Sequence, residues 1–96
     1  MITGTTPTGF EFEVDERVLN DYRFVEALAM AESDDSAKKL EGITTLPGLL
    51  LGTKDKKILM KKISAENDGF IPQEVVYEEI FAIINLVSEV SKNVKN

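Results

Sequence analysis

The longest run of regularly spaced apolar residues lies near the C-terminus, in the segment PQEVVYEEIFAIINLVSEVS at residues 72–91. At about 100° per residue, its polar side chains share one narrow strip and its apolar side chains fill an arc of roughly 200°. A surface helix usually needs an apolar stripe only a little over about 100° wide. The pattern therefore predicts a helix over residues 72–92 that forms the centre of the core, contacts another chain, or does both.

A period of two marks the N-terminal region instead. Phe10, Phe12 and Val14 alternate with glutamates, as in a strand with one buried face, and the preceding Pro7-Thr8-Gly9 is typical of a turn. We expect residues 1–14 to form a β-hairpin that pairs residues 2–5 with 10–14. A hairpin alone is barely stable in water, so its Phe face must pack on the helices.

Helical spacing recurs through the middle of the chain. The segment 15–33 predicts one helix, capped by Asp15 and bent near Asn20, where Asn20-Asp21 offers a second cap. The segment 36–52 predicts two short helical pieces with a break at Leu46, because Pro47 disfavours a helical residue before it. The segment 53–65 predicts a further helix with Ile58, Leu59 and Ile63 facing the core.

These elements predict a mainly α fold of four to five helices with a short N-terminal β-hairpin packed on them, or an α+β fold if the hairpin is counted. The 96 residues are expected to form a single domain, 1–96, with helical segments at 15–33, 36–52, 53–65 and 72–92. We expect the tail 92–96 to fray.

Composition narrows the function. The chain has 0 Cys and 0 His, so it lacks thiolate chemistry, the commonest general base and the commonest metal ligand. A net charge of -6 argues against a nucleic-acid binder, which normally has a basic surface. The N-terminus resembles no signal peptide and no run approaches the roughly 18 apolar residues of a membrane span, so we expect a cytoplasmic protein that binds no membrane.

Two patterns could indicate a metal site or a catalytic site, but each lacks residues that such a site requires. The turn ENDGFIPQEV invites a calcium-loop interpretation, but placing Gly69 at the sixth position puts Ser64 at the first and Val75 at the twelfth, where ligands are required. The carboxylate pairs Asp34-Asp35 and Glu78-Glu79 accompany no nucleophile and are expected to be solvated. We therefore expect no metal, no cofactor and no catalytic residue, and a protein that is not an enzyme.

The segment 53–62 is locally basic, with five lysines and one aspartate. Lys54, Lys57 and Lys61 share one helix face. A solvated surface explains this stripe, and electrostatic complementarity with a partner or a second copy is the alternative. No aromatic residue lies between the lysines to stack bases, which disfavours nucleic acid.

The order of three motifs resembles a known family. GFEFEVDERVLNDYRFVEALAMAE at 9–32, LLLG at 49–52 followed by a charged helix, and DGFIPQEVVYEEIFAII at 68–84 are similar to the small tail assembly chaperones of long-tailed, siphovirus-type bacteriophages. Similar genes occur in prophages of Gram-positive bacteria. The chain departs from the family pattern at Tyr22, where Trp is common, and at Pro47-Gly48.

The resemblance implies a chaperone that binds the helical tape-measure protein and keeps it soluble until the tail tube polymerises around it. It implies action in the host bacterial cytoplasm and absence from the mature virion, with the tail tube protein and a second copy of the chain as further candidate partners. A structural minor tail or connector component and a small helical adaptor for protein interactions remain the alternatives.

The family supplies no site residues, so the candidate site rests on the last helix and the lysine stripe. We hypothesise that Val76, Ile80, Ile83 and Val87 pack inward, while Ile84 joins Tyr77 and Phe81 in a partner surface; the opposite assignment of edges stays open. The candidate partner-binding residues are Val76, Tyr77, Ile80, Phe81, Ile84, Lys54, Lys57 and Lys61.

Overall fold

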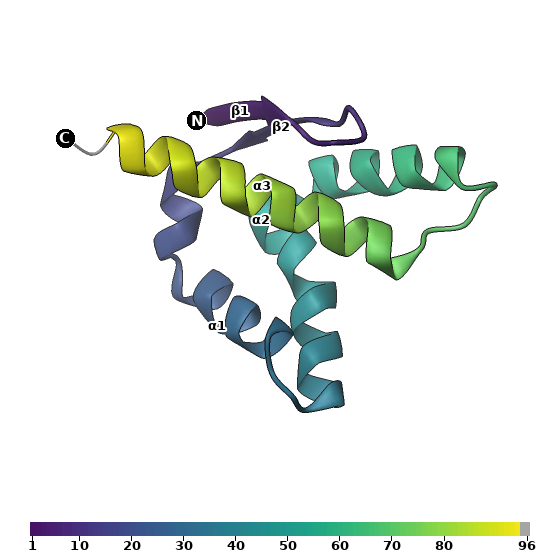
Figure 1. Cartoon of the computed structure of the whole chain (residues 1–96), viewed down its shortest axis with the longest axis horizontal. Coiled ribbons are helices and arrows are strands. Elements are labelled where there is room, and N and C mark those ends of the chain that lie inside the picture. The colour runs from purple at the N-terminus through teal and green to yellow at the C-terminus, as the bar shows by residue number, and fades with distance from the viewer. Residues whose placement is uncertain (95–96) are drawn as a thin grey trace.

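The computed structural model describes residues 1–94, with the side chains of residues 1–91. These residues form a two-stranded hairpin, a short 3-10 helix and three α-helices (Figure 1). The elements are β1 (Ile2–Thr5), β2 (Glu11–Val14), η1 (Glu16–Asn20), α1 (Tyr22–Ala31), α2 (Ser36–Glu66) and α3 (Gln73–Val94). The predicted mainly α fold with an N-terminal hairpin is confirmed, but the predicted four to five helices are wrong.

The hairpin follows its sequence pattern closely. The strands are antiparallel, with Ile2 opposite Val14 and Thr5 opposite Glu11. Phe10, Phe12 and Val14 are buried, whereas the glutamates between them are exposed. The predicted pairing and inward face are therefore confirmed.

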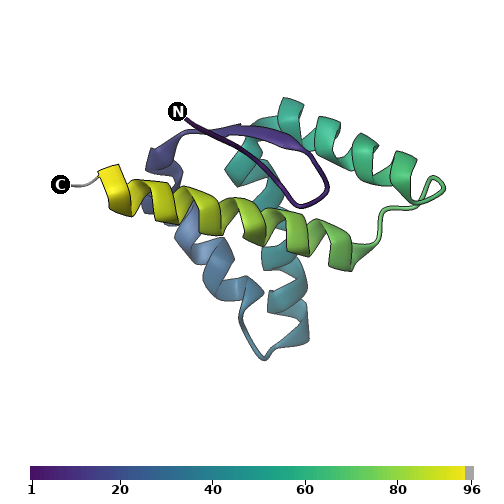
Figure 2. The same cartoon turned by 45° about the horizontal axis from the view of Figure 1, so that its top comes forward.

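Helix α3 is the central element, as its wide apolar arc indicates. Figure 2 shows it running between two groups of elements, with the hairpin on one side and α1 on the other. Its buried residues recur at helical spacing: Val76, Ile80, Ile83, Ile84 and Val87. The helix continues to Val94, so residues 92–94 are helical. The rest of the tail expected to fray, residues 95–96, lies outside the described residues.

The segment before α1 is divided rather than bent. Asp21 has extended backbone angles and caps α1, so the predicted helix over 15–33 becomes η1 followed by α1. Asp15 caps η1 in the same way. Both boundaries arise because an aspartate side chain satisfies free backbone N–H groups at a helix start.

Helix α2 breaks at a different residue from the predicted one. The helix continues through Leu46 and Pro47, both of which are fully buried, and loses helical geometry at Gly52, with φ 80° and ψ 166°. Burial of Leu46 and Pro47 outweighs the local penalty of proline, and glycine adopts a positive φ without steric cost. We call residues 36–51 the first limb and residues 53–66 the second limb; Figure 1 shows that they run in different directions.

Close packing holds α1 against the first limb. A Cβ at Gly42 would lie 2.3 Å from the backbone nitrogen of Ala31 and 2.5 Å from the carbonyl oxygen of Ala27. Gly42 therefore lets the two helix backbones touch. On the second limb, Leu59 and Ile63 face the core as predicted, but Ile58 does not: its side chain is 50% exposed.

Candidate partner-binding groove

The bend at Gly52 leaves an apolar groove between the two limbs of α2 and the start of α3. Its volume is about 310 Å³. It is lined by Leu40, Ile43, Thr44 and Pro47 of the first limb, Lys56 and Met60 of the second limb, and Ile71, Gln73 and Val76 at the start of α3. The lining is thus contributed by segments that are distant in the sequence.

A tight turn brings the last of these segments into place. Asp68 and Gly69 have positive φ angles of 57° and 84°, and the Gly69 N–H donates to the carbonyl oxygen of Ser64 at 2.8 Å. The chain then passes through Phe70 and Ile71 before α3 begins. The turn therefore places two apolar residues outside any helix, next to the groove.

Several large apolar side chains around the groove are exposed to solvent. Leu40 is 53% exposed, Ile71 43% and Phe70 69%. Leu40 and Ile71 line the groove, and Phe70 precedes Ile71 directly. A concave apolar surface with exposed apolar neighbours is the usual mark of an interaction site.

The structure places the candidate residues of α3 in three environments: the groove, the buried core and a half-buried surface. Val76 and Ile80 are buried, as are Ile83 and Val87 of the predicted inward edge, and Val76 also lines the groove. Ile84, expected at the outer edge, is buried and only 8% exposed. It therefore belongs to the core of this chain.

Tyr77 and Phe81 are half-buried and stack on each other, with ring centroids 4.4 Å apart and planes 20° apart. They do not line the groove. Their role as partner-binding residues stays a prediction, at a surface separate from the groove.

The lysine stripe lies on the second limb, where Lys54, Lys57 and Lys61 are exposed. Lys62 pairs with Glu66 one turn later. Lys56, another of the five lysines in the segment 53–62, is half-buried and lines the groove.

Sequence reasoning missed Leu40, Ile43, Met60 and Ile71. The sequence contained one signal for this site: the apolar pair Phe70-Ile71 lies between a polar turn and a proline, outside any predicted helix. The groove itself depends on where α2 bends, and the local pattern around Pro47 predicts that bend at Leu46, six residues before Gly52.

A buried polar contact fixes the hairpin loop on α3. Glu79 is 1% exposed, and its Oε1 accepts hydrogen bonds from the hydroxyls of Thr6 and Thr8, the latter at 2.6 Å. Thr6 Oγ1 in turn accepts from the Phe10 N–H at 3.1 Å. The expectation that Glu78 and Glu79 are both solvated is therefore wrong for Glu79, because the hairpin covers it.

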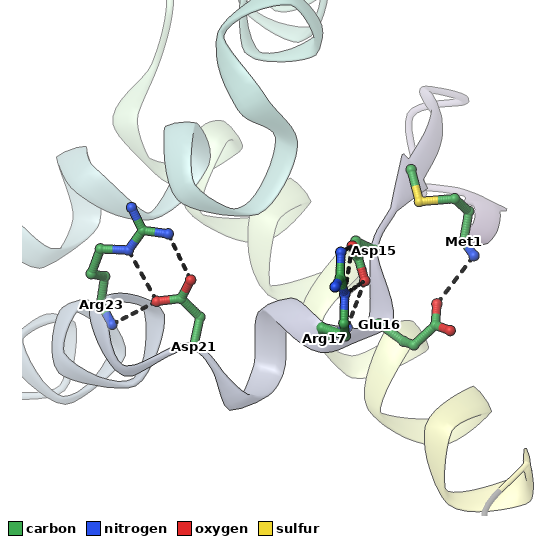
Figure 3. A network of polar contacts seen from close by, with 6 residues as sticks. All are labelled: Met1, Asp15, Glu16, Arg17, Asp21 and Arg23. Atoms are coloured by element: carbon green, nitrogen blue, oxygen red, sulfur yellow. Dashed lines mark hydrogen bonds and ion pairs between the residues drawn. The ribbon is translucent and has the colours of Figure 1, made fainter.

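Two Asp-X-Arg steps organise the chain around η1 (Figure 3). Asp15 caps η1 and pairs with Arg17, and Asp21 caps α1 and pairs with Arg23. Hydrogen bonds from the arginine side chain and backbone lower the pKa of each aspartate from 3.8 to about 2. The N-terminal amine of Met1 contacts Glu16 at 3.1 Å and ties β1 to the same region.

Within the described residues, no group of carboxylates is placed to hold a metal ion. No helix in this part of the chain is long and apolar enough to cross a bilayer. Comparison with protein-family models, with curated proteins and with solved structures gave no match.

Proposed function

We propose that this protein is a phage tail assembly chaperone that binds helical segments of the tape-measure protein. In this role it keeps the tape-measure protein soluble in the bacterial cytoplasm until the tail tube polymerises around it. The observation that carries the proposal is the apolar groove beside Gly52, with Leu40 and Ile71 exposed at its edge. The resemblance of three motifs to such chaperones supplies the identity of the partner.

A groove of this kind suits an amphipathic helix. Such a helix presents apolar side chains at positions i, i+3, i+4 and i+7, which enter a groove as anchors. Burying each aliphatic anchor contributes roughly 1.5–3 kcal/mol. Association itself costs an estimated 4–15 kcal/mol or more, so two or three anchors give weak binding.

Weak binding fits a cargo that must later be released. A long tape-measure helix offers many similar segments, so several chaperone copies can cover it while each contact stays reversible. Arriving tube subunits then displace the copies one at a time. A single tight site would oppose that displacement.

Co-expression tests this function. The protein is produced together with the tape-measure protein encoded in the same genome, and the tape-measure protein is measured in the soluble fraction and in pull-downs. We expect it to become soluble and to co-purify. Two matched variants then test the site: Leu40→Ser changes the lining of the groove, and Leu86→Ser changes the exposed side of α3. Only Leu40→Ser should reduce binding, whereas a general need for apolar surface would make both variants reduce it.

Two outcomes would contradict the proposal. The same gene could also yield a longer protein, by frameshifting, that begins with this sequence. If the tape-measure protein stays insoluble with this chain and also with that longer protein, the chaperone function is wrong. If the protein is found in purified virions, the alternative of a minor tail or connector component is favoured. A stable complex with one unrelated peptide would favour the adaptor alternative.

A further inference from the structure

The second limb is a basic segment on an acidic protein. Five lysines and one aspartate give residues 53–62 a net charge of +4, whereas the whole chain carries -6. The ion pairs found within residues 1–91 involve Lys62 but none of Lys54, Lys56, Lys57 and Lys61. These four ammonium groups are therefore available to pair with carboxylates of a partner.

Lys56 is the lysine placed to act inside the groove. It is half-buried and lines the groove together with Met60, one turn further along the second limb. Its Cδ lies 4.0 Å from the position that a Cβ at Gly48 would occupy, so its hydrocarbon stem reaches across to the first limb. A long lysine stem packs on apolar surface while its ammonium group stays accessible to solvent or a partner.

The opposite side of the groove carries charges of both signs. Lys39 and Glu41 are exposed on the first limb, four and three residues before Ile43 and Thr44, which line the groove. Residues three or four apart on a helix are neighbours, so both charges lie at that rim. An occupant with acidic residues is therefore attracted on the side of the second limb, whereas the two charges of the first limb offset each other.

We propose that the groove binds an amphipathic helix with an acidic flank, whose carboxylates pair with Lys56 while its apolar side chains enter between Leu40 and Ile71. This inference rests on the proposed function in that the occupant is a helical segment of a partner. It specifies which segments of that partner are bound. The exposed lysines of the second limb add a general attraction that speeds encounter at low salt.

The test uses three labelled helical peptides with the same apolar positions and with glutamate, glutamine or lysine on the flanks. Their binding to the full chain is measured by fluorescence polarisation at low and at high ionic strength. We expect the glutamate peptide to bind at least about fivefold more tightly than the lysine peptide at low salt. The difference should shrink at high salt, because exposed charges are screened.

Two variants with equal charge change locate the effect. Lys56→Glu changes the groove, whereas Lys38→Glu changes the far face of the first limb, because Lys38 is exposed two residues before the groove residue Leu40 and two residues of helix turn the side chain by about 200°. Lys56→Glu should abolish or invert the preference for the glutamate peptide, and Lys38→Glu should largely preserve it. Circular dichroism melting curves check that both variants remain folded.

The results that would overturn the inference are distinct from a failure of the chaperone function. Equal binding of the three peptides, equal effects of the two variants, or no binding of any peptide would each overturn it, whatever co-expression shows. Self-association of the free chain that Lys56→Glu abolishes would make a second copy the occupant and would also overturn it. Loss of tape-measure binding in co-expression would leave a positive peptide result standing.

Discussion

Glu79 shows how much one residue can depend on a distant segment. Its carboxylate is buried under the hairpin loop, where hydroxyls of Thr6 and Thr8 donate to it. A buried carboxylate is tolerated only when hydrogen bonds replace its hydration. Its exposed neighbour Glu78 belongs to the same helix and has the same chemistry, so the pair forms an internal control.

Glu79→Ala should lower the free energy of unfolding by about 1–3 kcal/mol, because it leaves the threonine hydroxyls without their acceptor. Glu78→Ala should change it by no more than about 0.5 kcal/mol. Urea unfolding followed by circular dichroism measures both. Equal small effects would mean that Glu79 does not hold the hairpin loop on α3.

The two capping aspartates predict how stability depends on pH. The folded-state pKa of Asp15 and of Asp21 is about 2, below the unfolded value of 3.8. A lowered folded pKa stabilises the fold above the unfolded pKa, and this contribution is lost as pH falls from about 4 through 2. Melting temperatures should fall as pH is lowered across that range, and less steeply at high salt, because both aspartates are partly exposed and their ion pairs are screened.

The double variant Asp15→Asn and Asp21→Asn keeps the capping oxygens but removes the titrating groups. In this variant, melting temperature should depend less on pH between about 4 and 2, and its pH dependence near neutral pH should hardly change. A profile with the original steepness would assign the acid sensitivity to other carboxylates.

At the scale of elements, glycines decide how α2 packs and where it turns. Gly42 is in backbone contact with α1, whereas a Cβ at Gly48 meets only Lys56 Cδ, at 4.0 Å. Alanine favours helix over glycine by about 1 kcal/mol at both positions. The difference between the two sites therefore comes from packing alone.

Gly42→Ala should destabilise the protein by roughly 1–3 kcal/mol, because α1 must move to admit the methyl group. Gly48→Ala should be neutral or stabilise it by up to about 1 kcal/mol. Denaturant unfolding of the two variants makes the comparison. Similar effects of both would contradict the close contact between α1 and the first limb.

The elements differ in how far the sequence pattern determines them. The hairpin and α3 are predictable because a period of two and a long helical period each fix which residues face the core. The break in α2 is not, because burial of Leu46 and Pro47 overrides the local penalty, and Gly52 provides the turn instead. Because the groove forms where α2 bends, a wrong position for the bend also hides the groove. Leu40 and Met60 could therefore be identified as site residues only from the folded chain.

At the scale of the whole molecule, helix α3 belongs to both the core and the groove. It contacts β1, η1 and α2, runs between the hairpin and α1 in Figure 2, and supplies Val76 to the groove at its N-terminal end. Leu40 and Ile71 remain exposed where the groove opens. A partner that covered them would remove apolar surface from water, which is the contribution that the proposed function requires.

Site-specific photo-crosslinking tests directly whether the groove holds the partner helix. The chain has 0 Cys, so a single introduced cysteine carries a benzophenone label to a chosen position. Thr44→Cys and Gln73→Cys place it at the groove. Glu89→Cys places it on the exposed side of α3, roughly 24 Å along the helix from Gln73.

In the complex recovered from co-expression, we predict cross-links to the tape-measure protein from positions 44 and 73 and not from position 89. Mass spectrometry should locate the cross-links on helical segments with acidic flanks. Strong cross-linking from position 89 with none from the two groove positions would contradict binding in the groove and place the partner on another surface.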